Sequence, residues 1–273
     1  MLRRPASCKS TLGVTLPVTT GYAALFAECL RVLEHTFRRL EKQVPPPVPT
    51  RLHTGIAIRY REKSIEQALL QKLARQVSGL HAIRTLLSAG LVQEQCVIQR
   101  TLDEIGEDIQ FLAIAAISGD LSSLHERYLS EFWEEEFDMP TAINSTQKRG
   151  MIPRQKIRAF VARGGGLDDP SSMNEVGRTI HKAYSGYVHA ASPQIMDMCG
   201  GPIPPVFHIA GMLETPRIED HTSDAANYFF RGILSARFVA KAFGDAQVSD
   251  VLGEYTARFG DLASIGYFKP KSG

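Results

Sequence analysis

Apolar residues recur every three or four positions through much of this chain, and this spacing constrains its fold more than any other feature. Each residue of an α-helix turns by about 100°, so residues at this spacing line one side of a helix. One such segment, 62–89, ends at Gly90, and the next runs from 91 to 117. Their apolar residues are Ile65, Leu69, Leu73, Val77, Leu80 and Leu87, then Ile98, Leu102, Ile105, Ile109 and Leu112. The spacing predicts two long helices.

Other segments show helical spacing and helix boundary signals. A capping box at Ser172 and Glu175, in which each side chain satisfies a free backbone amide, opens one of them. The expected additional helices cover residues 22–43, 121–137, 153–163, 172 to about 192, 215 to about 243, and 246–262. No segment alternates convincingly like a strand, and 200–211 is irregular with room for a short extended piece. We predict an all-α bundle of about seven to nine helices.

A proline-rich run, VPPPVP at 44–49, is the best candidate for a linker. Proline lacks the backbone amide and clashes with the preceding helical turn, so it should stop the first helix. We therefore expect residues 1–50 to form an N-terminal tail and helical arm, and residues 51–273 to form the bundle domain. The sequence leaves open whether the arm packs on the bundle.

Composition limits the class of protein. Hydrophobic residues make up 44% and charged residues 22%, as in ordinary globular proteins. A formal net charge of +2 gives no global basic field, so nucleic-acid binding would need a local patch. No apolar run approaches the roughly 18 residues that span a bilayer. The four cysteines are far apart and are expected to be free thiols in a reducing compartment, so we expect a cytoplasmic protein. We expect no membrane partner, no bound metal and no cofactor.

The stretch RTIHKAYSGYVHAAS, from Arg178 to Ser192, contains the strongest candidate for a chemical site. Lysine, serine and histidine follow Arg178 by four, seven and eleven positions, which places all four residues on one side of a helix. This polar stripe consists of Arg178, Lys182, Ser185 and His189. The remaining sides carry residues that can pack: Ile180, Ala183, Tyr184, Tyr187 and Ala191.

The helix over 91–117 offers a partner for the polar stripe. Arg100 and Glu104 are four residues apart, the spacing of an ion pair on one helix, and lie opposite its apolar side. Charged groups on a helix that becomes buried need partners. We therefore expect the two segments to meet in space, with Glu104 near His189.

Two motifs carry a resemblance to a known group. R-T-x-x-E at Arg100–Glu104, followed by Y-S-x-Y-V-H-A-x-S at Tyr184–Ser192, resembles a bacterial group of HEPN-like helical proteins. The resemblance covers roughly 62–244. It implies a helical bundle and, in active members, metal-independent RNA cleavage in defence or stress, usually by a homodimer. Such members share an arginine followed, four to six residues on, by a histidine of the same helix.

Carried over to this chain, the resemblance assigns catalytic roles to His189 and Lys182, and it makes RNA the expected partner. Ser185, which can hydrogen-bond a phosphate oxygen, is the third candidate catalytic residue. Lys182 stands where active members have arginine, and Arg178 comes one helical turn too early. Lysine still stabilises phosphate charge, but as a point charge and not as a planar fork. The residues expected to bind substrate are Arg178, Arg100, Glu104 and Tyr184.

Other interpretations remain open. His189 also fits a core or interface histidine, Ser185 a contact between helices, and Tyr184 a packing residue. The chain would then be a non-catalytic helical interaction or dimerisation module. A third reading, a metal-dependent hydrolase, rests on four residues that equally fit a solvated first helical turn. These are Glu219, Asp220, His221 and Asp224.

Overall fold

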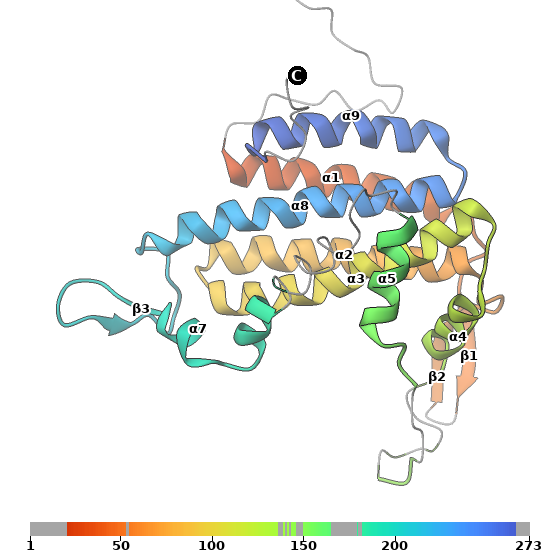
Figure 1. Cartoon of the computed structure of the whole chain (residues 1–273), viewed down its shortest axis with the longest axis horizontal. Helices are drawn as coiled ribbons and strands as arrows, with labels where there is room; N and C mark the ends of the chain where they lie inside the picture. Colours follow the sequence, from red (N-terminus) through yellow and green to blue (C-terminus); the bar gives the residue numbers. More distant parts are fainter. Residues whose placement is uncertain are drawn as a thin grey trace, which may run out of the picture.

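The computed structural model describes residues 21–52, 55–135, 139, 141, 143–145, 150–164, 179 and 182–265. Long helices that run side by side dominate it (Figure 1). They are α1 (Tyr22–Glu41), α2 (Ile65–Ser88), α3 (Val92–Ser118), α8 (Arg217–Ala242) and α9 (Ala246–Leu262). The shorter helices are α4 (Ser123–Phe132), α5 (Arg154–Gly164) and α7 (Ser192–Met196), and residues 182–188 are also helical. The predicted all-α bundle is confirmed.

Helix α8 lies at the centre of the bundle, in contact with α1, α2, α3 and α9. Most of its buried side chains are small or aromatic, and the Phe229 ring stacks on Phe26 of α1 with ring centroids 4.1 Å apart. Gly232 allows close approach, because a Cβ there would lie 2.6 Å from Leu80 Cδ1 of α2. These contacts make one continuous core from helices that are far apart in sequence.

Helix α1 belongs to this core. Leu25, Leu33 and Leu40 are buried among residues of the other long helices. At its far end, Arg39 forms an ion pair with Asp245, at the turn between α8 and α9, with 2.8 Å between Nε and Oδ2. Helix α1, which belongs to the expected arm, therefore packs on the bundle, a point that the sequence left open. The predicted tail, residues 1–20, lies outside the described residues.

The proline-rich run leads into a β-hairpin that the sequence analysis did not predict. β1 (Val48–Leu52) pairs antiparallel with β2 (Gly55–Arg59), and Val48 lies opposite Arg59. Pro49 is tolerated because a two-stranded sheet has open edges, where a missing amide breaks no ladder. The expectation that the chain holds no convincing strand was wrong here.

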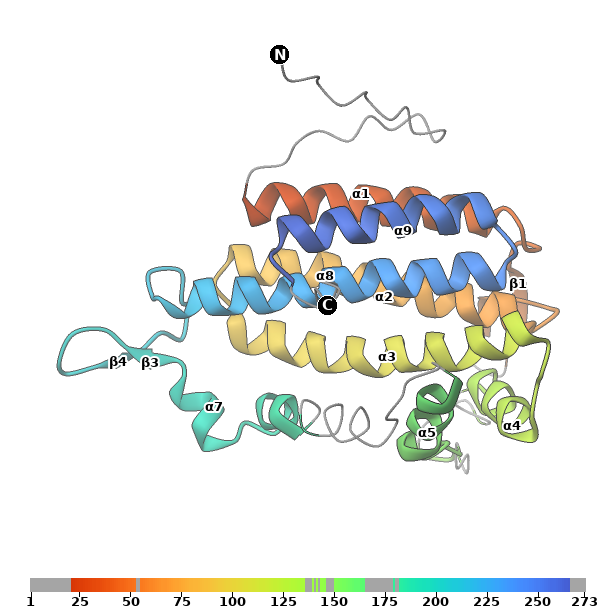
Figure 2. The same cartoon turned by 45° about the horizontal axis from the view of Figure 1, so that its top comes forward.

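A second small hairpin projects from the opposite end of the bundle (Figure 2). β3 (Cys199–Gly200) pairs with β4 (Val206–Phe207) within the segment expected to be irregular with a short extended piece, so this prediction is confirmed. Among the described residues, no helix has both the length and the apolar composition needed to cross a bilayer.

Candidate functional site

The helical residues 182–188 are attached to the bundle through tyrosines. The Tyr184 hydroxyl donates a hydrogen bond to the carboxylate of Asp224 on α8. The same carboxylate oxygen accepts a hydrogen bond from Gln99 Nε2 of α3, at 3.3 Å. The Tyr184 ring also packs edge-on against Tyr228, with centroids 5.8 Å apart. Tyr184 therefore links the 182–188 helix to α8 and, through Asp224, to α3. It acts as a packing residue, as the alternative interpretation of Tyr184 predicted.

A second set of contacts lies one turn further along. The Tyr187 hydroxyl donates to Asp197 at 3.1 Å, and Asp197 also forms an ion pair with Arg217 at 3.4 Å. Cys96 Sγ lies 3.5 Å from His221 Nδ1. Burial raises the pKa of the Cys96 thiol and lowers the pKa of His221. This pair is therefore a neutral thiol beside a neutral imidazole near pH 7.

The hydroxyls of this inner side also stay protonated. Burial raises the pKa of both Tyr184 and Tyr187, and nearby carboxylates raise it further. A protonated hydroxyl is what each tyrosine needs to donate to its carboxylate. On the inner side, the tyrosine hydroxyls therefore donate hydrogen bonds to aspartate carboxylates, and these bonds fix the orientation of the helix.

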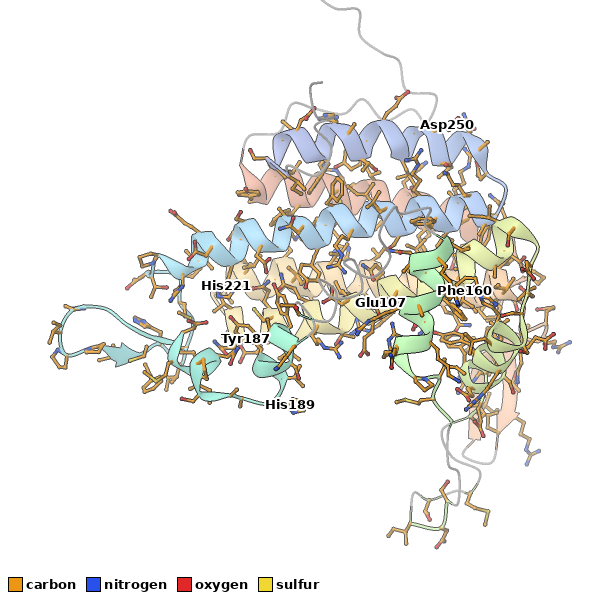
Figure 3. The ribbon with its side chains drawn as sticks, viewed as in Figure 1. Glu107, Phe160, Tyr187, His189, His221 and Asp250 are labelled. Carbon is orange, nitrogen blue, oxygen red and sulfur yellow. The ribbon has the colours of Figure 1, made fainter. Side chains whose placement is uncertain are left out.

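The outer side of the same helix carries three residues of the predicted polar stripe. Lys182 and His189 are exposed and Ser185 is half-buried. The His189 amide donates to the Ser185 carbonyl at 3.0 Å, so the helical turn continues to the histidine. Figure 3 shows His189 on the side away from the long helices. Arg178, the fourth stripe residue, lies outside the described residues.

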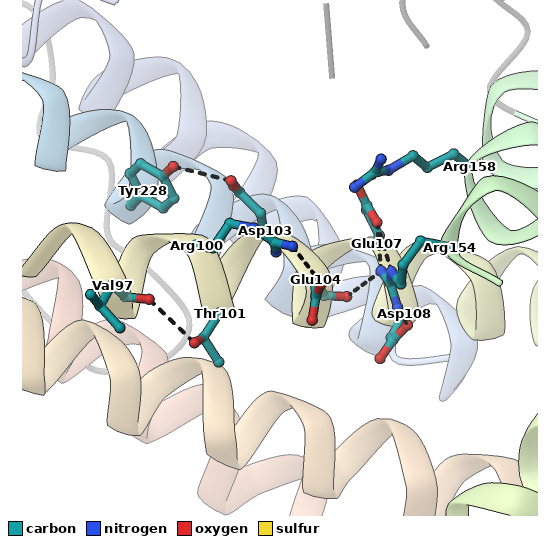
Figure 4. Close-up of polar contacts among 10 residues, drawn as sticks. All are labelled: Val97, Arg100, Thr101, Asp103, Glu104, Glu107, Asp108, Arg154, Arg158 and Tyr228. Carbon is teal, nitrogen blue, oxygen red and sulfur yellow. Dashed lines mark hydrogen bonds and ion pairs between the residues drawn. The ribbon is translucent and has the colours of Figure 1, made fainter. Parts of the chain in front are cut away.

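The acidic side chains of α3 form ion pairs and hydrogen bonds with neighbouring side chains (Figure 4). The predicted ion pair between Arg100 and Glu104 is confirmed, with 2.8 Å between Nη2 and Oε1. Asp103 is buried and pairs with Arg231 of α8 at 2.6 Å, and it accepts a hydrogen bond from Tyr228 at 3.2 Å. Burial raises the pKa of Asp103, although Arg231 opposes this shift.

Helix α5 covers the next turn of α3 with arginines. Arg154 pairs with Glu107 at 2.5 Å and also with Asp108, while Arg158 pairs with Glu107 at 2.7 Å. Lys72 of α2 supplies a further cation to Asp108 at 2.8 Å. Cations of α2, α5 and α8 thus pair with three acidic side chains of α3, namely Asp103, Glu107 and Asp108.

The two predicted segments are linked, but through a pairing that sequence reasoning missed. The contact runs from Tyr184 through Asp224 to Gln99, and the pairing of Glu104 with His189 stays a prediction. A signal was present, because Gln95, Gln99 and Asp103 are spaced by four on α3, as are Asp224 and Tyr228 on α8. Such spacing predicts polar sides that face each other.

The proposed metal-binding residues at the start of α8 are divided between two sides of the helix. Glu219 and Asp220 are exposed, and Asp220 lies 3.8 Å from Arg217. His221 and Asp224 instead face Cys96 and Tyr184. Across the described residues, no three His, Cys, Asp or Glu side chains are arranged to hold a metal ion.

Comparison with known proteins adds no assignment. No family model matches the chain, and neither the curated proteins nor the solved structures contain a match. The HEPN-like resemblance therefore stays a prediction that depends on the residues quoted for it.

Proposed function

We propose that this chain is a HEPN-like cytoplasmic protein that acts on RNA through the outer side of residues 182–189. One observation carries the proposal: Lys182, Ser185 and His189 share the outward side of a helix whose inner side is fixed by Tyr184 and Tyr187. A cation, a hydroxyl and an imidazole in a row on a fixed helix can contact the phosphates of an RNA backbone. From Lys182 to His189 the helix rises by about 10 Å, which favours contact with an extended strand over a single small anion.

The chemistry requires no metal, since RNA supplies its own nucleophile. The imidazole of His189 removes the proton of a 2′-hydroxyl, and the resulting oxygen attacks the adjacent phosphorus. The bond to the 5′-oxygen breaks, and that oxygen takes up a proton from solvent, leaving a 2′,3′-cyclic phosphate. Lys182 stabilises the negative charge on the phosphorane, and Ser185 donates a hydrogen bond to a phosphate oxygen.

The proposal is tested by incubating the purified full chain with mixed RNA in excess chelator. We expect cleavage that His189→Ala lowers by about a hundredfold or more, because general acid–base catalysis contributes at least that much. Lys182→Ala should lower it about tenfold or more, and Lys182→Arg should retain it, because a planar guanidinium also binds phosphate.

The matched controls are His35→Ala on α1 and Lys241→Ala on α8, which remove an exposed histidine and an exposed lysine elsewhere. Both should cleave RNA at the wild-type rate. Equal cleavage by the wild type and His189→Ala would assign the activity to a contaminant. A wild type that neither cleaves nor binds RNA would eliminate the proposal.

A second candidate is a non-catalytic helical module that pairs subunits. It is favoured by the inner tyrosine network, which gives the 182–188 helix an architectural role, and by lysine at the position of the expected arginine. It predicts no RNA cleavage by the wild type, and it would be favoured if His189→Ala and Arg100→Ala each lowered stability by a few kcal/mol, as expected for residues with an architectural role.

A further inference from the structure

One face of the β1–β2 hairpin, which extends from one end of the bundle, is uncovered (Figure 1). The register places Pro49 opposite Ile58 and Arg51 opposite Ile56, so these four side chains share one face. All four are exposed, Ile56 by 79% and Ile58 by 58%. The opposite face of β1 is half-buried and consists of Val48, Thr50 and Leu52. An exposed apolar face of this kind is typical of an interaction surface.

The backbone of β2 also has an open edge. In an antiparallel pair of strands, opposite residues alternate between pairs that exchange two hydrogen bonds and pairs that exchange none. Pro49 has no amide, so it and Ile58 form a pair of the second kind, and so do Arg51 and Ile56. The amides of Ile56 and Ile58 therefore point away from β1. No described residue outside the hairpin accepts a hydrogen bond from either amide.

The two edges of the hairpin differ in their capacity to accept a further strand. Proline and charged residues on an exposed edge prevent strand addition, and β1 carries both, at Pro49 and Arg51. The outward residues of β2 are two isoleucines with free amides. The Ile58 carbonyl accepts a hydrogen bond from Arg59 Nη1 at 2.9 Å, and a carbonyl oxygen has a second lone pair. The edge of β2 is therefore the one that can add a strand.

The charge of the hairpin indicates the chemistry of its partner. Residues 48–63 contain four lysine or arginine residues and one acidic residue, Glu62. Arg59 pairs with Glu135 at 2.7 Å, whereas Arg51, on the uncovered face, has no carboxylate partner among the described residues. A hollow of about 500 Å³ is lined by Arg51 and Ile56 together with Pro49, Thr50, Leu52 and Gly55. Such a surface attracts an acidic partner and repels a second copy of the same hairpin.

We propose that β2 binds an extended, acidic peptide segment of another protein, which adds to the hairpin as a third, antiparallel strand. Amides that point outward at every second residue match the ladder of an extended backbone. Residues that exchange hydrogen bonds across such a ladder lie opposite each other on the same face. Apolar side chains of the peptide therefore cover Ile56 and Ile58, while its carboxylates are attracted by Arg51 and the neighbouring cations. The inference concerns a protein partner and stands apart from RNA cleavage.

The test measures binding of a labelled peptide to the full chain by fluorescence anisotropy. The probe is a capped peptide of about eight residues in which valine and glutamate alternate, and we expect saturable binding. The same peptide N-methylated at its valines should bind at least about tenfold more weakly, because the amides that face β2 are lost. A peptide with lysine in place of glutamate should also bind at least about tenfold more weakly, because its charge has the sign of the hairpin.

Variants of the chain locate the binding site. Ile58→Pro removes the outward amide but, like Pro49 opposite it, breaks no bond of the β1–β2 ladder, and it should weaken binding at least about tenfold. The matched control is Ile58→Val, which keeps the amide and an apolar side chain and should bind like the wild type. Arg51→Glu leaves the backbone unchanged; it should weaken binding of the glutamate peptide and strengthen binding of the lysine peptide. All three variants should melt like the wild type, as expected for exposed positions.

Three outcomes would overturn the proposal. The wild type could show no saturable binding of the glutamate peptide, or the peptide could bind equally well when N-methylated or when offered to Ile58→Pro and Arg51→Glu. The third outcome is a wild type that binds single-stranded RNA and not the peptide, with RNA binding lost in Arg51→Glu, which would make a nucleic acid the occupant. His189→Ala should bind the peptide like the wild type, so failure of this proposal and failure of RNA cleavage are distinguishable.

Discussion

At the scale of single residues, His125 shows how burial determines protonation. The side chain is fully buried at the start of α4, where its ring stacks on Phe111 with centroids 4.1 Å apart. The Ser122 amide donates to Nδ1 at 3.2 Å, so this nitrogen carries a lone pair and no proton. Burial lowers the pKa of His125 below its ordinary value. A protonated, charged His125 ring would be buried away from water, and a proton on Nδ1 would displace the hydrogen bond from the Ser122 amide.

We therefore expect the titration of His125 to make the stability of the protein depend on pH. Below the ordinary histidine pKa of about 6.5, the unfolded chain takes up a proton that the folded chain does not. The free energy of unfolding should fall as pH falls from 6.5 towards the lowered pKa, by at most about 1.4 kcal/mol per pH unit for one proton. His125→Leu should reduce this slope in urea unfolding at pH 7.5, 6.5 and 5.5.

The control for this experiment is His35→Leu, which removes an exposed histidine and should keep the wild-type slope. Some slope should remain in His125→Leu, because burial also lowers the pKa of His221. An unchanged slope in His125→Leu would show that this imidazole does not control acid unfolding.

Sequence spacing predicted part of the site and could not predict the rest. Offsets along one helix placed Lys182, Ser185 and His189 on one side, as the structure does. Which side faces the bundle depends on partners from other segments, here Asp224 and Gln99. Spacing within one helix contains no information on those partners.

At the scale of elements, two glycines in long helices should respond in opposite ways to the same substitution. In α8, a Cβ on Gly232 would lie 2.6 Å from Leu80 Cδ1 and 3.7 Å from Leu33 Cδ1, both fully buried side chains. In α3, a Cβ on Gly106 would meet only Ser235 Oγ, at 3.8 Å.

Gly232→Ala should destabilise the protein by about 1–2 kcal/mol, because an added methyl group forces the packed α2 and α8 apart. Gly106→Ala should stabilise it by up to about 1 kcal/mol, because alanine loses less backbone entropy in a helix. Urea unfolding of both variants measures the two changes. Equal effects would mean that packing at Gly232 relaxes freely.

The long helices were predictable because each carries its own signal. The apolar spacing and Gly90 gave α2 and α3 within a few residues, and the predicted 246–262 coincides with α9. The β1–β2 hairpin was missed because its strands are short and mostly exposed, so there is little alternation between apolar and polar residues. The proline run correctly predicted the end of a helix, but its prolines also argued against a strand, and β1 begins within it at Val48.

At the scale of the whole molecule, one ion pair ties the first long helix to the last turn of the bundle. Arg39 of α1 makes two hydrogen bonds to the Asp245 carboxylate, at 2.8 and 2.9 Å. The same carboxylate accepts the Val248 amide and caps α9. Burial alone would raise the pKa of Asp245, but the hydrogen bonds from Arg39 and Val248 outweigh it and lower the pKa.

Asp245→Ala should lower the free energy of unfolding by about 1–3 kcal/mol at pH 7, from the lost cap and the lost contacts with Arg39. Because the folded pKa is depressed, this contribution is present above the ordinary aspartate pKa of about 3.9. It should disappear as pH falls through the lower folded value. Asp250→Ala, at an exposed position of α9, is the control and should change stability by less than about 0.5 kcal/mol.

The central position of α8 also determines the order in which the bundle is completed during synthesis. Helices α1, α2 and α3 leave the ribosome first. Each has an apolar side that stays uncovered until α8, which begins at Arg217, has been synthesised. About 100 residues separate the end of α3 from that point, which at ordinary elongation rates takes roughly 5–20 s. Through this interval we expect the nascent helices to expose the apolar surface that α8 later covers, which leaves a defined time in which a chaperone could bind it.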